Sequence, residues 1–398
     1  MRSRNLQSGC LVLFVLLSSG ISCIAQEAPA GLNSFGFALF TNLIEGKLSE
    51  NTIISPLSID MALTMVWNGS ANGTRSAMER VMGLKKDSDS VKVSEAWQKY
   101  VKGIEGESKG FKLNIANSLW IQDGQKLNPN FIHTSVDLLN AEVQQIDLEN
   151  SVVAAALINK WVSDKTAGKI TKAVSPDALS ITEMVLINAV YFKAEWLRKF
   201  DSTYTVTDSF TLLNGQKKSV KMMGMFDNID YIETPDIQMM RKPYVGNSVD
   251  AVILLPRKNV DAAKLLKNLN LQAWNEFNNQ MRSHQVLLSL PKVKLEYSTE
   301  LIRVLAKMGM GKAFSNLADL SGMFSPPKGL YIGTAIHKTT LEINEENTEA
   351  TAVTVMTTDG ASETPREILT MRVDHPYIFA LQDHKTGGLL FLGWIANP

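Results

Sequence analysis

Two kinds of hydrophobic pattern alternate along the chain. Apolar residues recur every three or four positions in three stretches, which predicts amphipathic helices over 32–43, 152–166 and 300–310. Asn33 or Ser34 can cap the start of the first helix, and Gly309 with Gly311 can stop the third. Short, continuous apolar runs elsewhere predict strands that are covered on both faces, over 184–192, 251–255, 286–290 and 389–394.

These elements predict one α+β domain. The predicted helices concentrate in the first half and the strands in the second, and no Pro/Gly/Ser-rich linker or internal repeat divides the chain. Of 398 residues, 45% are hydrophobic and 20% charged, as is typical of a folded globular protein. Its 40 basic residues balance 40 acidic ones, whereas a general nucleic-acid binder needs a positive excess.

The first 25 residues have the layout of a secretory signal peptide. Two arginines precede an apolar run over 10–17, and small residues at 23 and 25 predict cleavage after Ala25. The run is shorter than the ~20 residues of a membrane span, so we do not expect a membrane anchor. Cleavage would remove Cys10 and Cys23 and leave a secreted, extracellular domain over 26–398, with 38 basic and 40 acidic residues.

Two glycosylation sequons agree with export from the cell. They are Asn68-Gly-Ser and Asn72-Gly-Thr, so Asn68 and Asn72 are the expected glycan acceptors. Both are short patterns that also arise by chance.

Several familiar catalytic motifs are missing. The chain has no His-Glu-x-x-His zinc motif, no Gly-x-Ser-x-Gly elbow and no phosphate loop. Its five histidines lack metal-ligand spacing, so we expect neither a metal nor a cofactor. A secreted hydrolase with a Ser-His-Asp triad assembled from distant segments stays open as an alternative, because triads are defined by geometry.

A segment near the C-terminus has the pattern of a strand with one small, uncharged face. From Thr348, every second residue is Thr, Ala, Ala, Thr, Met, Thr or Gly, whereas the other face begins with Glu349 and ends with Asp359. The polar stretch 362–367 follows and is typical of an exposed, cleavable loop. This combination fits an ordinary strand and turn, or a strand that inserts into a sheet after the loop is cut.

The residues 345–352, Glu-Glu-Asn-Thr-Glu-Ala-Thr-Ala, resemble the hinge of the reactive-centre loop of the serpins. The resemblance extends over nearly the whole chain, in blocks that follow the family's order: 51–59, 186–196, 290–292, 318–322, 337–338, 374–376 and 391–398. It implies a serpin fold of three β-sheets and about nine helices, with an exposed reactive-centre loop over about 345–372. It also implies an inhibitor of serine proteases: the protease cleaves the loop, the loop inserts into the main sheet, and the protease is trapped covalently. A monomer is the default expectation.

The resemblance assigns roles to three groups of residues. The hinge comprises Glu345, Glu346, Asn347, Thr348, Glu349, Ala350, Thr351 and Ala352. The polar cluster beneath the opening sheet, the shutter, comprises Ser55, Pro56, Ser58, Asn188 and His337. The point where insertion begins, the breach, comprises Trp196, Lys292 and Glu345, with an expected salt bridge between the last two. Taken singly, Asn188 also fits a satisfied core amide, and Lys292 and Glu345 also fit surface charges.

Asn347 departs from the family pattern, because inhibitory members usually have Gly there. Asn tolerates positive φ better than most side chains, so the hinge can still turn. We therefore expect an inhibitor, and the alternative is a non-inhibitory serpin that acts as a binding or carrier protein.

The family's register places the scissile bond between Ala361 and Ser362, seventeen residues into the loop counted from Glu345. A small residue at this point suits elastase-like proteases. Because the loop is long, Arg366, which suits trypsin-like proteases, and Glu363 are alternatives.

Three lysines, Lys92, Lys99 and Lys102, lie on one candidate helix. They predict either a site for a sulfated polysaccharide or a solvated helix face, the second because Glu95 lies among them.

Overall fold

The computed structural model describes residues 31–106, 111–179, 182–327, 329–345 and 368–398. The expected signal peptide over 1–25, with Cys10 and Cys23, lies outside the described residues. So do the hinge after Glu345 and all candidate scissile positions, namely Ala361, Ser362, Glu363 and Arg366.

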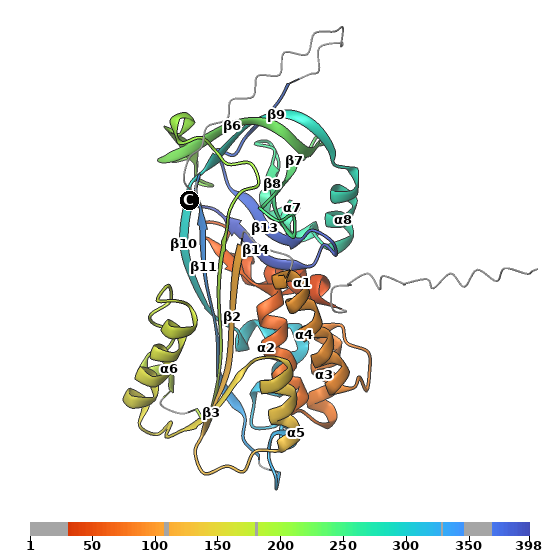
Figure 1. Ribbon diagram of the computed structural model, residues 1–398, viewed down its shortest axis with the longest axis vertical. Coiled ribbons are helices and arrows are strands. Elements are labelled where there is room, and N and C mark those ends of the chain that lie inside the picture. The colour runs from red at the N-terminus through yellow and green to blue at the C-terminus, as the bar shows by residue number, and fades with distance from the viewer. Residues whose placement is uncertain (1–30, 107–110, 180–181, 328, 346–367) are drawn as a thin grey trace, which may run out of the picture.

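The described residues form nine α-helices together with short 3₁₀ and π segments. The α-helices are α1 Leu32–Ile44, α2 Pro56–Asn68, α3 Asn72–Met82, α4 Ser90–Gly106, α5 Pro129–Ile132, α6 Ser151–Lys165, α7 Ala262–Asn268, α8 Leu271–Gln280 and α9 Ile302–Leu305. Most of them gather on one side of the lower half of the molecule in Figure 1.

Fourteen strands accompany these helices in the described part of the chain. They are β1 Thr52–Ile54, β2 Phe111–Gln122, β3 Glu142–Ile146, β4 Met184–Ala194, β5 Val206–Thr211, β6 Lys217–Glu233, β7 Ile237–Pro243, β8 Val249–Pro256, β9 Arg282–Pro291, β10 Val293–Glu300, β11 Ile332–Ile343, β12 Leu369–Arg372, β13 Tyr377–Asp383 and β14 Leu389–Ile395. The expected α+β class is therefore confirmed.

Hydrogen bonds join these strands into two continuous sheets rather than three separate ones. The smaller has the order β10-β11-β4-β2-β3, and the larger has β1-β14-β13-β8-β7-β6-β9-β12 with β5 on β6. The long strand β6 explains the difference from the three expected sheets: it pairs with β5 near its start, with β9 over 222–231 and with β7 over 230–233. Two of the three expected sheets are thereby continuous through one strand.

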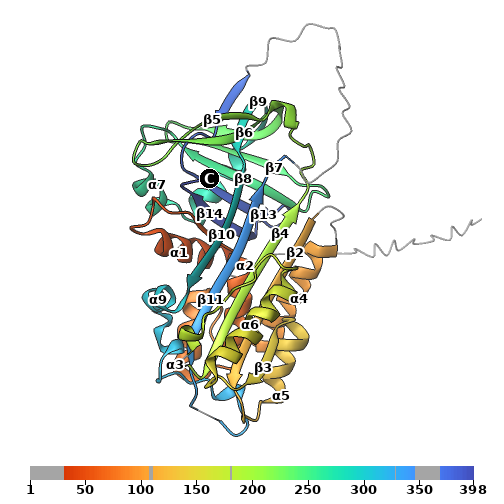
Figure 2. The same cartoon turned by 90° about the vertical axis from the view of Figure 1, so that its left-hand side faces the viewer.

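The five-stranded sheet has a helix on each face, as Figures 1 and 2 show. Helix α6 covers one face, where its Ile158 and Val162 pack in a cluster with Val185 and Ile187 of β4. Helix α2 packs against β2 and β4 from the other face. Burial on both faces explains why β4 reads as a continuous apolar run in the sequence.

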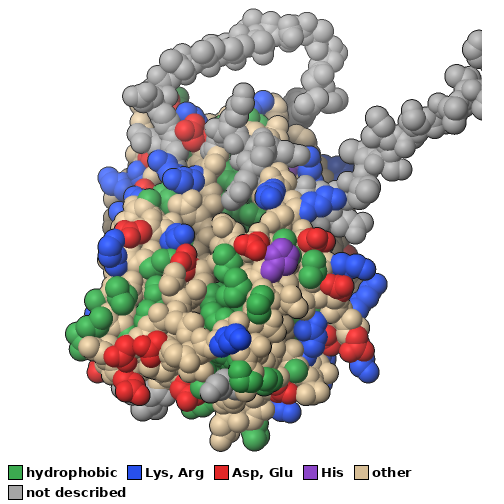
Figure 3. All heavy atoms as spheres, turned by 60° about the horizontal axis from the view of Figure 1, so that its bottom comes forward, with side chains coloured by type: hydrophobic (Ala, Val, Ile, Leu, Met, Phe, Trp, Pro, Cys, Tyr) green, Lys and Arg blue, Asp and Glu red, His purple; other side chains and the backbone are tan. Residues whose placement is uncertain are grey.

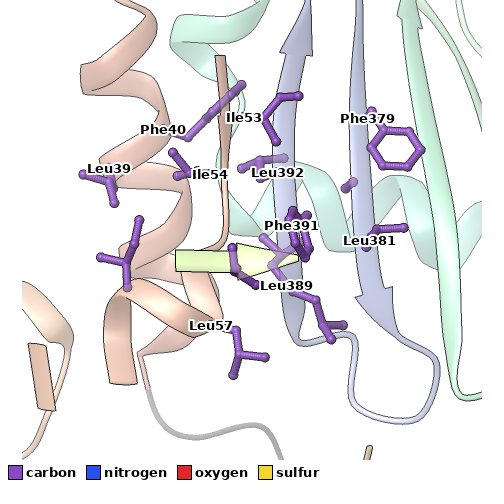
Figure 4. Packing of buried hydrophobic residues seen from close by; sticks show 14 of the residues in the cluster. Leu39, Phe40, Ile53, Ile54, Leu57, Phe379, Leu381, Leu389, Phe391 and Leu392 are labelled. Atoms are coloured by element: carbon purple, nitrogen blue, oxygen red, sulfur yellow. The ribbon is translucent and has the colours of Figure 1, made fainter. Parts of the chain in front are cut away.

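The largest apolar core joins the first helices to the larger sheet. Figure 4 shows Leu39 and Phe40 of α1 and Leu57 of α2 facing residues of β1, β13 and β14. The facing residues include Ile53, Ile54, Phe379, Leu381, Leu389, Phe391 and Leu392, all of them buried. This packing anchors the start of α2, and therefore Ser55, against the rest of the molecule.

The structure corrects three local predictions. The cap residue of α1 is Gly31 in the left-handed region (φ 88°), because Asn33 lies inside the helix and bonds Gly387 O and Leu389 N instead. The helix expected over 300–310 is only four α-helical residues followed by a π turn, in which Gly309 has φ 106°. Strand β9 is covered on one face only, since Leu287 is 47% exposed.

Candidate functional site: a polar seam between two parallel strands

Three polar residues align across the middle of the five-stranded sheet. Asn117 of β2 pairs in register with Asn188 of β4, and Asn188 pairs with His337 of the parallel strand β11. All three are buried, with exposed fractions of 3%, 0% and 0%. In-register residues project from the same face of a sheet, so these side chains can bond to one another.

Their hydrogen bonds connect three strands with the start of α2. The His337 ring bonds through Nδ1 to Asn188 Oδ1. The Asn188 amide nitrogen donates to Ser58 O at 3.0 Å and contacts two further acceptors, Ser58 Oγ and Asn117 Oδ1. The amide nitrogen has only two N–H groups, so it cannot bond all three of these acceptors at once, and the side chain can adopt more than one arrangement.

His337 is held as a neutral imidazole. The Ser55 N–H can only donate, and it lies 3.3 Å from His337 Nε2, so Nε2 accepts and the proton lies on Nδ1, which donates to Asn188. Complete burial lowers the pKa of His337 to about 3, because a charged ring would lose its hydration.

The sequence at 55–58 explains why helix α2 begins at this point. Ser55 is the N-cap residue, its Oγ accepting from Ser58 N at 3.2 Å, and Pro56 occupies the first turn, where a missing N–H costs nothing. The helix start is therefore pinned to the sheet. All five predicted shutter residues lie together here; Asn117 was missed, because only strand register brings it opposite Asn188.

The predicted salt bridge at the end of β11 is present. Lys292 Nζ lies 2.6 Å from Glu345 Oε2, and Thr205 Oγ1 donates to Glu345 Oε1 at 2.6 Å. Burial pushes the pKa of Glu345 upward, but hydrogen bonds from Lys292 and Thr205 and the charge of Lys292 leave it below its usual value. The Glu345 carboxylate, with its side chain only 8% exposed, is thus ionised and bound from two sides.

Trp196 secures the neighbouring backbone. Its indole Nε1 donates to Asn344 O at 2.9 Å, and its ring stacks on Tyr244 with a centroid distance of 4.3 Å. Trp196 is buried, so this bond is shielded from water. The three predicted breach residues therefore fix residues 344 and 345, the last that the structure describes before 346–367. No local pattern points to Thr205 or Tyr244.

The two sequons differ in accessibility. Asn68 is half-buried, and its amide donates to Ser94 Oγ at 2.9 Å. Asn72 is exposed at the start of α3 and donates to Asp319 Oδ2 at 2.7 Å. Glycosylation stays a prediction, with Asn72 the more accessible acceptor in the folded chain.

Lys92, Lys99 and Lys102 are exposed on α4, beside the exposed Glu95. On the face shown in Figure 3, basic and acidic side chains are interspersed rather than gathered by sign. Within the described ranges, no three His, Cys, Asp or Glu residues are placed to hold a metal ion. No helix in that same part of the chain has the length and apolar character to cross a membrane.

Comparison with known proteins decides the family. The family model described as Serpin (serine protease inhibitor) matches residues 30–398. The chain belongs to the serpin family. The leukocyte elastase inhibitor of Bos taurus is 32% identical over 383 residues, which cover 94% of this chain and all of that protein.

Solved serpin structures agree with the fold. Human thyroxine-binding globulin with thyroxine matches with a TM-score of 0.82 and 25% identity, over 93% of this chain and 98% of that one. Native protease nexin-1 with heparin matches with a TM-score of 0.82 and 23% identity, over 92% and 98% of the two chains, which shows a shared fold. Serpins are protease inhibitors rather than enzymes, although the matched structures include a carrier. The family has extracellular and intracellular members.

Proposed function

We propose that this serpin inhibits serine endopeptidases: the protease cleaves within 346–367, and the cut loop then inserts between β4 and β11. One observation carries the proposal. Strands β4 and β11 are parallel neighbours in the middle of the sheet, and the loop leaves from the end of β11. A chain that reverses after β11 would run antiparallel to both strands and could pair with both at once.

The energetic balance supports insertion. Each newly paired residue would add a hydrogen bond worth about 0.5–1.5 kcal/mol net, so a dozen residues would supply on the order of 10 kcal/mol. The parallel pairing between β4 and β11 is lost, and antiparallel pairing on two sides replaces it. The alternating small face of 348–360 suits a strand that must become buried.

The polar seam supports the same mechanism. The His337–Asn188 bond crosses the boundary that insertion would open, and the other shutter bonds lie beside it. The Asn188 amide has three acceptors within reach, so its hydrogen bonds can re-form around a new strand. Apolar side chains at this place would offer no directional contacts in either state. The breach residues hold the start of the loop in place until cleavage frees a strand that can compete for pairing with β4 and β11.

The target class follows from the loop sequence and from one relative. Ala361–Ser362 is the proposed scissile bond, and its small side chain fits an elastase-like specificity pocket, in agreement with the similarity to leukocyte elastase inhibitor. Arg366 would instead direct the protein to trypsin-like proteases, and Glu363 is the third alternative. We further propose a signal peptide over 1–25, one secreted domain over 26–398, a monomeric state and a glycan on Asn72. A sulfated-polysaccharide site at the α4 lysines remains a secondary proposal.

A panel of elastase-like and trypsin-like proteases tests the proposal. The inhibitor should form a 1:1 complex that survives SDS, and mass spectrometry of the released C-terminal peptide should identify the cut bond. Cleavage of the loop without any complex, across the whole panel, would contradict inhibition.

A carrier function is the second candidate, supported by the similarity to thyroxine-binding globulin and by Asn347 in place of Gly. Loop cleavage separates the two candidates. Insertion should raise the melting temperature sharply, whereas a carrier that never inserts its loop should melt at nearly the same temperature before and after cleavage.

A further inference from the structure

Large apolar side chains are exposed on the outer face of the sheet formed by β6, β9 and β12, near the top of Figures 1 and 2. Phe226 of β6 and Leu287 of β9 are cross-strand partners, 55% and 47% exposed. The sequence neighbours of Leu287, Val286 and Leu288, point to the opposite face and are fully buried. Phe226 and Leu287 therefore lie on the exposed face of the sheet, and the opposite face is the buried one.

Two further apolar residues extend the same surface. Ile368, 58% exposed, directly precedes β12, whose Thr370 pairs with Leu287. Tyr204, 66% exposed, lies against Gly224: a Cβ at Gly224 would lie 3.1 Å from Tyr204 O and 3.5 Å from Tyr204 Cβ. Gly224 is two residues before Phe226 and so shares its face. We call these four residues the outer patch: Tyr204, Phe226, Leu287 and Ile368.

The outer patch is bordered by neutral or neutralised groups. Asn228, Gln285 and Thr370 belong to the same face of the three strands. Arg372, the nearest basic residue on β12, is paired with Asp208 and Asp374. Exposed apolar residues that cluster in this way, in place of scattering singly, indicate a contact surface, and the neutral border suits an apolar partner.

The position of the patch identifies the partner. All three candidate scissile positions, Ala361, Glu363 and Arg366, lie within seven residues of Ile368. An extended chain spans at most about 3.5 Å per residue, so a protease bound at any of these bonds is held within about 25 Å of Ile368. A circular contact face of the ordinary size, roughly 800 Å², is about 32 Å across, which is comparable with this distance.

We propose that the outer patch is a docking surface for the target protease, contacting apolar side chains beside its active-site cleft. This inference rests on the proposed function and deepens it, since it assigns part of the selectivity for the protease to Phe226 and Leu287 rather than to the loop alone. Docking would act before cleavage, because it holds the protease at the loop while the scissile bond enters the active site.

The double variant F226S/L287S tests the patch, and V152S/L157S on α6 is the matched control, with side chains 67% and 46% exposed. The association rate constant with whichever protease of the panel is inhibited should fall about 10-fold in F226S/L287S and stay unchanged in the control. The stoichiometry, the SDS-resistant complex and the rise in melting temperature after loop cleavage should all be retained.

Equal rates in the wild type and F226S/L287S, or equal slowing in both variants, would overturn docking. So would a dimer in sedimentation experiments that only F226S/L287S abolishes, because the patch would then bind a second copy of this chain. If the wild type is cleaved without forming a complex, inhibition fails, yet a slower cleavage of F226S/L287S alone would still support docking. A wild type that no protease cleaves or binds would end both proposals.

Discussion

Asn188 of β4 is bonded to neighbours on both sides of its strand: to Asn117 of β2 and to His337 of β11. Its amide thus links the parallel pair β4–β11 on one side of the strand to the antiparallel pair β2–β4 on the other. The same amide donates to the backbone of Ser58 at 3.0 Å, so the start of α2 is part of the link. Any opening of the seam between β4 and β11 must rearrange this one side chain.

The variant Asn188→Ala should be destabilised by about 1–3 kcal/mol, because the buried His337 Nδ1–H loses its acceptor. We also expect the uncut protein to insert its loop more readily on warming, since the seam is weaker. Chemical denaturation measures the first effect. Asn42→Ala on α1, whose amide makes only a local bond to Ala38 O, is the control and should be close to wild type. If both variants lost the same amount of stability, the seam would have no special role.

The stability of the protein should fall as the pH drops below about 6.5 because of His337. Its pKa is about 3 in the folded chain, against an ordinary value of 6.5, so the unfolded state takes up a proton that the folded state does not. The contribution of His337 to the free energy of unfolding is therefore fully present above pH 6.5. It falls by about 1.4 kcal/mol per pH unit below that value, down to the folded pKa.

Urea denaturation between pH 4.5 and 7 measures this slope. In His337→Gln the contribution of this residue should vanish, although the variant is less stable overall. His133→Gln provides the control, because the His133 side chain is 53% exposed. A slope that persists unchanged in His337→Gln would mean that other groups cause it.

The variant Glu345→Gln should loosen the breach. It removes the ion pair with Lys292 but keeps the size of the side chain, and because Lys292 is 40% exposed the expected loss is at most about 1 kcal/mol. The pKa of Glu345 is lowered in the fold, so its contribution is present above the ordinary carboxyl pKa and disappears as the pH falls through the folded value.

Trp196 fluorescence is a local readout for this variant, since its indole bonds to Asn344, the residue before Glu345. Because the chain has seven tryptophans, its signal is taken as the difference from the same protein carrying Trp196→Phe. Calorimetry gives the global effect. Glu45→Gln, which breaks the exposed pair with Lys307, should change neither signal. An unaltered fluorescence spectrum in Glu345→Gln would show that the ion pair does not hold this end of β11.

The variant Thr348→Arg should turn the inhibitor into a substrate. Thr348 begins the small face of the alternating segment, and a guanidinium there would have to be buried without a partner on insertion. The protease should then cleave the loop at an unchanged rate and escape without an SDS-resistant complex. Glu349→Arg puts the same group on the opposite face of the segment and should remain an inhibitor. Inhibition by Thr348→Arg equal to that of wild type would contradict deep insertion of the hinge.

Elements whose burial is uniform or periodic can be predicted from the sequence alone. The apolar run at 184–192 is strand β4, and the helical spacing over 152–166 is helix α6, because a buried strand and an amphipathic helix each impose their own period on the side chains. The resemblance to the serpins assigns Ser55, Asn188 and His337 to one cluster, and hydrogen bonds join them in the structure. The ends of helices are less well predicted from local sequence. Asn33 is a residue type that often caps a helix, yet its side chain bonds to β14.

The residues that meet across strands are known only from the folded chain. Asn117 lies opposite Asn188, Thr205 reaches Glu345, and Phe226 pairs with Leu287, although nothing in their local sequences relates them. Register and strand order depend on the packing of the whole chain, so a one-residue shift would send each side chain to the other face. The sequence specifies how each segment buries itself, and the assembled sheet determines which polar groups share a seam and which apolar groups stay exposed.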